Sequence, residues 1–291
     1  MRITNKLNLP EPFVRAVSEK TYDNQGSWRT VTELIAPPKI AALKRRHDDE
    51  IETDASELVY TFQGEAAHAL VERAAKTMCE EGWLSEQRLF EEVQGKKVSG
   101  AYDLFHPETG ELIDVKNSTG YKAKGGEAPK EWVEQTNLLA HFLRKQGHVV
   151  NKIQVLLLIR DHSKMEAMRD PDYPQYPVTY LSVPIWTDEA CKQFLEERVR
   201  LHLLAEQEEV ACSPEDRWAK PTIWAIKKKG QSRAITGGLY AVEEKAKEKL
   251  AELGPGHEIE YRPGINIRCK AYCPVSKFCA QYQNTLTRQG N

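Results

Sequence analysis

Apolar residues follow helical spacing in some stretches of the chain and alternate or run together in others. Spacings of three and four residues indicate an amphipathic helix, whereas alternation indicates a strand with one buried face. The predicted helices span 34–46, which Pro37 and Pro38 interrupt, 56–81, 129–146 and 187–210. The predicted strands span 84–93, 97–105, 111–116, 152–160 and 178–185. Turn residues over 106–110 separate the second and third strands, which are therefore expected to form a β-hairpin.

The order of these elements predicts an α/β core around a mixed sheet. We expect an N-terminal helical and irregular segment over 1–55, the core over 56–210, and a C-terminal region over 211–291. The C-terminal region contains the basic patch Lys227–Lys229 and a predicted helix over 241–253.

Composition limits the class of protein. Apolar residues make up 40% of the chain, which is typical of a globular protein. The longest apolar stretch, 155–159, is too short to span a bilayer, and no apolar signal follows the first residues, so we expect a cytoplasmic protein without a membrane partner. The net charge of −2, from 41 basic and 43 acidic residues, excludes a generally basic nucleic-acid coat. A locally positive groove can still bind DNA.

Two acidic residues and a lysine mark the predicted hairpin. Asp114 and Lys116 are two residues apart, so their side chains share one face of the strand, and the hairpin can bring Asp103 beside Asp114. Two carboxylates suit Mg²⁺ or Mn²⁺, which can polarise a phosphate and activate water. A neighbouring lysine can stabilise the developing charge. The pattern indicates phosphodiester hydrolysis, although a solvated hairpin with exposed charges is the simpler alternative.

These residues also resemble a known family. Gly100 and Asp103, followed by Asp114-Val-Lys116, resemble the RecB-like branch of the PD-(D/E)XK nucleases. Gly64 and His68, on the preceding predicted helix, match the upstream motif of that branch. The resemblance implies a restriction-endonuclease-like core, with a central mixed sheet flanked by helices.

The resemblance also implies roles for individual residues. The implied metal ligands are His68, Asp103, Asp114 and the carbonyl of Val115, and the implied catalytic residues are Asp103, Asp114, Lys116 and Gln135. Gln135 matches the start of the family's Gln-x-x-x-Tyr motif, but Leu139 stands where the family has tyrosine. Glu65 is a further candidate carboxylate.

Three of the six cysteines, Cys269, Cys273 and Cys279, lie within eleven residues. Such clustering indicates metal or iron–sulfur ligation rather than disulfides. We expect Cys212 to be the fourth ligand, because it opens the C-terminal region and precedes a helix-start pattern over 213–215; Cys79 is the alternative. Four thiolates also suit zinc, and free cysteines are the simplest alternative.

The cysteine cluster resembles that of the AddB-type and CRISPR-associated exonucleases, which implies a [4Fe–4S] cluster. In those families the first cysteine precedes the core, whereas here no cysteine precedes Cys79.

The expected function is therefore a Mg²⁺- or Mn²⁺-dependent DNA nuclease of a bacterial or phage-infected cell. The resemblance suggests an exonuclease that acts on single strands or DNA ends in recombination or repair, with protein partners in recombination as a further expectation. Lys122, Lys124 and Lys130 follow the hairpin and are expected to contact phosphates, as is Lys227–Lys229. The alternative is a non-catalytic DNA-binding or scaffold protein with a structural iron–sulfur or zinc site.

Overall fold

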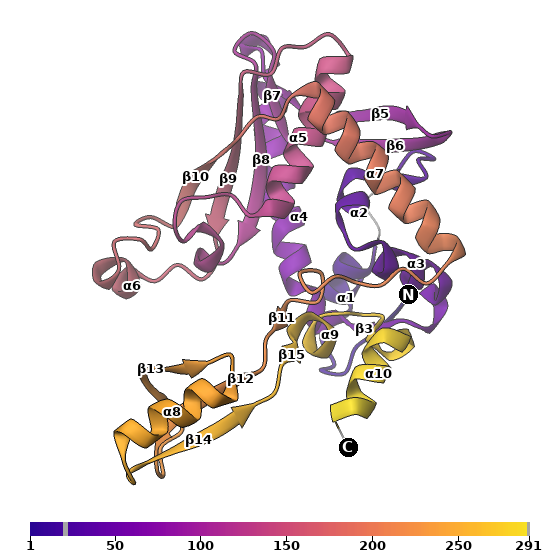
Figure 1. The fold of residues 1–291 in the computed structure, drawn as a ribbon. Coiled ribbons are helices and arrows are strands. Elements are labelled where there is room, and N and C mark those ends of the chain that lie inside the picture. The colour runs from indigo at the N-terminus through magenta and orange to yellow at the C-terminus, as the bar shows by residue number, and fades with distance from the viewer. Residues whose placement is uncertain (20–22, 290–291) are drawn as a thin grey trace. The chain divides into compact units, whose positions relative to one another are not determined.

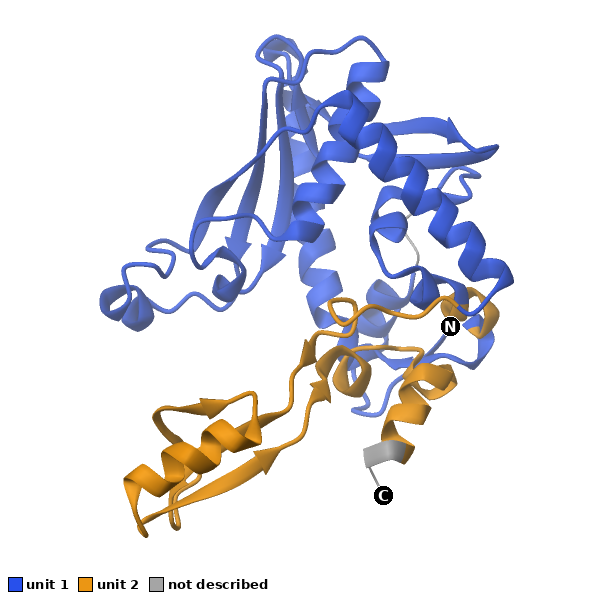
Figure 2. Ribbon diagram, viewed as in Figure 1, with its two compact units in different colours: residues 1–42, 48–209 blue, residues 43–47, 210–291 orange. Residues whose placement is uncertain are grey.

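The computed structural model describes residues 1–19 and 23–289, which divide into two units. Figure 2 colours unit 1, residues 1–42 and 48–209, in blue and unit 2, residues 43–47 and 210–291, in orange. The chain is of mixed α/β type, with several separate sheets. The long continuous part of unit 2 begins one residue before the predicted start of the C-terminal region.

Unit 1 combines strands with helices from its first residues onward. Its strands are β1 (Arg2–Thr4), β2 (Arg29–Thr30), β3 (Glu52–Asp54), β4 (Leu84–Ser85), β5 (Arg88–Val93), β6 (Lys96–Ala101), β7 (Leu104–His106), β8 (Glu111–Ser118), β9 (Lys152–Ile159) and β10 (Val178–Val183). Its helices are α1 (Glu11–Ser18), α2 (Val31–Ile35), α4 (Val59–Thr77), α5 (Lys130–Lys145), α6 (Lys164–Arg169) and α7 (Asp188–Gln207), and α3 (Pro38–Arg46) leads into the second unit. Short 3-10 turns are η1 (Asp48–Glu50), η2 (Ala55–Leu58), η3 (Cys79–Glu81) and η4 (Gly120–Ala123).

The main sheet of unit 1 has the strand order β10-β9-β8-β7-β4. Figure 1 shows β10, β9, β8 and β7 side by side. It is mixed, because β8 and β9 are parallel while the other neighbours are antiparallel. Residues 112–115 of β8 are all buried, which requires cover on both faces of the strand. Helix α4 contacts β8, and α5 packs on β8 and β9, so β8 lies at the centre of the unit.

A second sheet, of order β2-β6-β5, explains why two predicted strands are each divided. The chain leaves the main sheet after β4 to form β5, and returns to it after β6 to form β7. The continuous strands expected over 84–93 and 97–105 are therefore wrong, and only β7 forms the predicted hairpin with β8. The expected N-terminal segment contributes β2 to this second sheet and packs α2 on α5 and α7.

Helix boundaries in unit 1 follow local signals. Helix α2 begins at a capping box in which Thr30 and Glu33 bond each other's backbone N–H groups. Ala36 and Pro37 separate α2 from α3, which begins at Pro38. Thr187 caps α7 as predicted, since its hydroxyl accepts the N–H of Ala190.

Gly100 lets β6 lie directly against two helices. A Cβ atom at this position would come within 2.5 Å of Leu139 Cδ2, on α5, and 3.0 Å of Val31 Cγ2, on α2. Leu139 is 1% exposed and belongs to the hydrophobic core. The position at which the family's Gln-x-x-x-Tyr motif has tyrosine is therefore occupied here by a core residue. The glycine thus keeps β6, and the chain leading to Asp103, close to α5.

We expect Gly100→Ala to lower the free energy of unfolding by about 1–3 kcal/mol, because the added methyl group overpacks the core. Gly64→Ala is the matched control, since a Cβ at this helical position meets nothing within 4 Å. The control is expected to raise stability by about 0.5–1 kcal/mol, because alanine favours a helix more than glycine does. Urea unfolding followed by circular dichroism measures both, and equal effects would contradict the packing argument.

A buried histidine joins three elements of unit 1. His141, on α5, is 2% exposed and lies 3.2 Å from Glu91 on β5 and 3.3 Å from Asp188 at the start of α7. The contact with Glu91, aided by Asp188, raises the pKa of His141 above its usual value, although burial opposes this shift. The protonated ring therefore holds α5 between two carboxylates.

The raised pKa of His141 predicts how the free energy of unfolding changes with pH. The contribution of His141 is fully present below the unfolded-state pKa of about 6.5 and is lost as the pH rises through the higher folded-state pKa. The loss of unfolding free energy on His141→Gln should therefore be larger at pH 6 than at pH 9. Urea titrations across this range measure the difference, and a loss that grows with pH would show the opposite linkage.

Unit 2 is built on short elements. Its strands are β11 (Ala219–Lys220), β12 (Ile223–Lys228), β13 (Ala234–Tyr240), β14 (His257–Arg262) and β15 (Ile265–Asn266), and its further helical segments are α8 (Glu243–Leu253), α9 (Ile267–Ala271), η5 (Ser276–Phe278) and α10 (Ala280–Gln289). The sheet β13-β12-β14 packs against α8 around three fully buried side chains, Ala225, Ile226 and Ala246. The predicted helix over 241–253 corresponds to α8, which ends at Gly254.

The helix-start pattern over 213–215 is not followed by a helix. Residues 214–218 form hydrogen-bonded turns, in which the hydroxyl of Ser213 accepts the N–H of Asp216. The bond has the form of a helix cap, but the chain passes into β11 instead of continuing a helix.

Among the residues that the structure describes, no helix combines the length and apolar character needed to cross a membrane.

Candidate metal and catalytic site

Three segments that are distant in sequence meet beside the central strand of unit 1. Helix α4 carries His68, the joint between β6 and β7 carries Asp103, and β8 carries Asp114 and Lys116. The register of β8 on β9 aligns Asp114 with Val155 and Lys116 with Leu157, so the two charged side chains share one face as predicted. The structure therefore brings His68 and Asp103 together and sets Asp103 against the strand that carries Asp114 and Lys116, while the compact group of ligand atoms among the described residues does not include Asp114.

Asp103 connects β8 to α4. Its Oδ2 accepts the N–H of Val115 at 2.5 Å, and its Oδ1 lies 3.2 Å from His68 Nδ1. The ladder between β7 and β8 ends at Leu104 and Ile113, so the carboxylate satisfies a backbone donor beyond the last paired residues. Both oxygens of Asp103 are thus held by groups from other elements.

Asp114 and Lys116 form a largely buried ion pair. Lys116 Nζ donates a 3.0 Å hydrogen bond to Asp114 Oδ1 and lies 2.8 Å from Oδ2. The shorter contact lacks hydrogen-bond geometry, so the buried Oδ2 accepts no hydrogen bond from the described residues. The side chain of Asp114 is 3% exposed and that of Lys116 is 20% exposed. The carboxylate of Asp114 is therefore neutralised by the Lys116 ammonium, and one of its buried oxygens takes part in the ion pair without accepting a hydrogen bond.

Burial and neighbouring charges shift the pKa values of Asp114 and Lys116 in opposite directions. Burial raises the pKa of Asp114 to about 6, with a further increase from Asp103, while the ammonium of Lys116 opposes the rise. Burial alone would lower the pKa of Lys116, but Asp114 and Asp103 together outweigh burial and raise it. Lys116 is therefore a charged donor at neutral pH.

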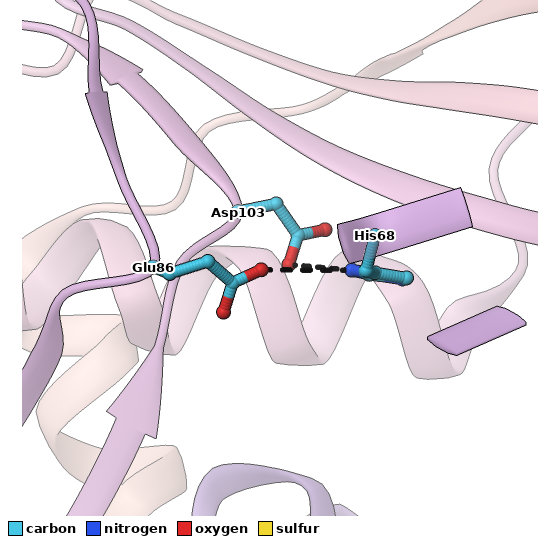
Figure 3. A group of neighbouring side chains, drawn as sticks. All are labelled: His68, Glu86 and Asp103. Atoms are coloured by element: carbon cyan, nitrogen blue, oxygen red, sulfur yellow. Dashed lines mark ion pairs between the residues drawn. The ribbon is translucent and has the colours of Figure 1, made fainter. Parts of the chain in front are cut away.

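Glu86 is an additional member of the site that the sequence analysis missed. Its carboxylate lies 3.8 Å from His68 Nδ1, and the ligand atoms of His68, Glu86 and Asp103 all lie within 4.8 Å of one another. Figure 3 shows the oxygens of Glu86 and Asp103 directed toward the ring nitrogen of His68. In the sequence, Glu86 and Gln87 interrupt the apolar pattern of 84–93, and this interruption was the signal that could have identified Glu86. Glu65, the carboxylate considered from sequence, is exposed on α4.

The backbone of Glu86 is strained. Its φ of 52° lies in the left-handed region, which costs about 1–3 kcal/mol for a residue other than glycine. A partly exposed ion pair contributes about 0–1 kcal/mol, so the 3.8 Å contact with His68 does not offset this cost. The conformation is held by the joint between the sheets, where the N–H of Glu86 donates to the carbonyl of Asp103 at 3.3 Å.

The donor set fits a divalent cation. Carboxylate oxygens suit Mg²⁺ and Mn²⁺, and an imidazole nitrogen also ligates Mn²⁺. The contacts with Asp103 and then Glu86 raise the pKa of His68 to about 10, because two carboxylates hold its proton. A cation would replace that proton between the same groups. Val115 takes part through its N–H, and ligation by its carbonyl stays a prediction.

The other residues expected near the hairpin lie in more ordinary surroundings. Gln135 is half-buried on α5. The three lysines expected to contact phosphates each pair with a carboxylate: Lys122 with Glu131 at 2.6 Å, Lys124 with Asp170 at 2.8 Å and Lys130 with Glu134 at 3.8 Å. In unit 2, Lys227 pairs with Glu258 and Glu260, while Lys228 and Lys229 are exposed.

The C-terminal cysteines of unit 2 influence one another through their charges. Burial, and then the charges of Cys273 and Cys279, raise the pKa of Cys269. Burial and the charge of Cys279 also raise the pKa of Cys273, although a backbone N–H opposes the rise. No three cysteine Sγ atoms among the described residues lie within 4.8 Å of one another, so the thiols do not form a compact group of ligand atoms.

Cys212 is tied to the same part of unit 2. Its N–H donates to Gln281 Oε1 and its carbonyl accepts from Gln281 Nε2, both at 2.9 Å. Gln281 lies two residues beyond Cys279, so the start of the C-terminal region is fastened beside the last cysteine. Cys79, the alternative fourth ligand, is exposed in η3 of unit 1.

No family model and no curated protein matches the chain. Among solved structures, the chain is similar to the crystal structure of SSO0001, with a TM-score of 0.45 and 13% sequence identity. This similarity covers 66% of the present chain and 85% of the other.

Proposed function

We propose that the chain is a divalent-cation-dependent DNA nuclease with a PD-(D/E)XK core of the RecB-like branch over residues 56–210. The observation that carries the proposal is the meeting of His68, Asp103 and the Asp114–Lys116 pair beside β8. The mixed order of the main sheet supports it, as do α4 before the hairpin and α5 after it. A hairpin of solvated charges does not account for Asp114, which is 2% exposed.

The side chains have distinct roles in this proposal. A bound Mg²⁺ or Mn²⁺ would polarise the scissile phosphate and lower the pKa of attacking water. His68, Asp103 and Asp114 would hold the cation, and Asp103 would also keep β8 in register through the N–H of Val115. Lys116, charged and fixed by Asp114, would donate a hydrogen bond to a phosphate oxygen and stabilise charge there. Gln135 would contact the substrate from α5.

Surface lysines would guide the DNA backbone. The pairs made by Lys122, Lys124 and Lys130 are partly exposed, and such pairs contribute only about 0–1 kcal/mol each. A phosphate can therefore replace the carboxylate partner at small cost. Exposed Lys228 and Lys229 provide a further basic patch in unit 2. The proposed substrates are single strands or DNA ends, as in recombination or repair.

We also propose that Cys212, Cys269, Cys273 and Cys279 ligate a [4Fe–4S] cluster, with zinc as the alternative metal. The occurrence of three cysteines within eleven residues and the double hydrogen bond of Cys212 to Gln281 support this assignment. Such a cluster would fasten the first residues of the C-terminal region to α9, η5 and α10. Its role would be structural, because it would cross-link short elements that bury few side chains.

The nuclease proposal is tested by cleavage of labelled single- and double-stranded DNA in the presence of Mg²⁺ or Mn²⁺. Asp114→Asn and Lys116→Ala should each lower the cleavage rate by about 100-fold or more, since each removes a group that stabilises charge at the phosphate. Lys192→Ala, which removes an exposed lysine of α7, is the matched control and should cleave at the wild-type rate.

Undiminished cleavage by both site variants would refute the assigned centre. Wild-type protein that is folded, binds DNA and retains its metals, yet cleaves neither substrate, would support the non-catalytic alternative. End-labelled strands read in the same assay distinguish exonuclease from endonuclease products.

The cysteine proposal is tested by metal analysis of protein purified without oxygen. We expect iron and acid-labile sulfide near four atoms per chain, as a [4Fe–4S] cluster requires. Cys212→Ser and Cys273→Ser should lose most of the iron, while Cys79→Ser should retain it. One zinc per chain without iron would show that the cysteines bind zinc rather than an iron–sulfur cluster. Iron loss in Cys79→Ser but not in Cys212→Ser would identify Cys79 as the fourth ligand.

A further inference from the structure

The joint between the two sheets of unit 1 sets Glu86 opposite Asp103. The chain passes from β4 to β5 through Glu86 and Gln87, and from β6 to β7 through Tyr102 and Asp103. Two backbone hydrogen bonds cross the joint: Glu86 N–H to the Asp103 carbonyl and Tyr102 N–H to the Gln87 carbonyl. Both crossings therefore leave an acidic side chain at the same point, where His68 of α4 faces them.

We propose that Glu86 is a direct ligand of the divalent cation, together with His68 and Asp103. This inference rests on the proposed metal centre and extends its ligand set by a residue outside the sequence motifs. The three ligand atoms already lie within 4.8 Å of one another, and they converge in Figure 3. A single cation between them would contact all three after small side-chain rotations.

The charge of the centre supports a third carboxylate ligand. Glu86, Asp103 and Asp114 contribute three negative charges, and Lys116 contributes one positive charge. With neutral His68, two negative charges remain, which a divalent cation cancels.

The competing explanation is that Glu86 only pairs with protonated His68. The distance of 3.8 Å is too long for a hydrogen bond, whereas Asp103 lies at 3.2 Å from the same nitrogen. The strained φ of Glu86 is also not offset by so loose a contact. The carboxylate of Glu86 thus lies close to His68 but does not form a hydrogen bond with it.

The two explanations predict opposite results for Mn²⁺ binding by the full chain. Isothermal titration calorimetry at pH 7.5, with free Mn²⁺ also counted by electron paramagnetic resonance, gives affinity and stoichiometry. A ligand role predicts that Glu86→Gln weakens Mn²⁺ binding at least about 10-fold, since even indirect partners of metal ligands cost this much. Binding that is unchanged or tighter would overturn the proposal, because loss of a simple ion pair leaves His68 freer to bind metal.

Two further variants separate ligation from folding. Glu86→Gly suits the left-handed conformation, so its stability to urea should equal or exceed that of the wild type while Mn²⁺ affinity falls as in Glu86→Gln. Glu92→Gln, at an exposed position near the far end of β5, removes one carboxylate outside the proposed ligand set and should bind Mn²⁺ as the wild type does. If Glu92→Gln weakened Mn²⁺ binding equally, the loss in Glu86→Gln would be explained by the change in net charge. That result would overturn the assignment of Glu86 as a ligand.

The same titration distinguishes this inference from the nuclease proposal. Mn²⁺ binding that depends on Glu86, in a protein that cleaves no DNA, supports the ligand assignment and contradicts the proposed activity. DNA cleavage with Mn²⁺ affinity independent of Glu86 supports the activity and contradicts the ligand assignment.

Discussion

The candidate site depends on the carboxylate of Asp103, which is held from two directions. One oxygen accepts the Val115 N–H at 2.5 Å, and the other lies 3.2 Å from His68. This carboxylate therefore connects the central strand β8 with helix α4, at the point where the chain returns from the second sheet to the main sheet. The divided strands are not incidental to the site, because a continuous strand through 97–105 would not turn Asp103 toward β8 in this way.

The second constraint is the number of charged side chains that lie at or near the buried carboxylate of Asp114. Burying Asp114 without a partner would be costly, and Lys116 supplies only one compensating charge for three nearby carboxylates. The proton on His68 provides part of the remaining compensation when no cation is bound. Such an arrangement stabilises the fold poorly by itself, and its excess of negative charge supports the proposed cation site.

The two units achieve their internal order by different means. Unit 1 has an extensive core in which α5 and α7 pack on the sheets, and Gly100 permits the close approach of β6 to α5. Unit 2 has a small sheet with few fully buried side chains and a separate group of cysteines near the C-terminus. Small cores gain more from a bound metal than large ones do, which fits the proposed structural role of the cysteines.

The sequence by itself determined α4, α5, α7 and β9, because the spacing of apolar residues reports directly which face of an element is buried. It also determined that Asp114 and Lys116 share a face, which follows from their separation of two residues along a strand. Only the tertiary structure decided the division of two strands, the packing of Leu139 on Gly100 and the arrival of Glu86 beside His68. These features depend on how distant segments twist and pack against one another, which no local pattern encodes.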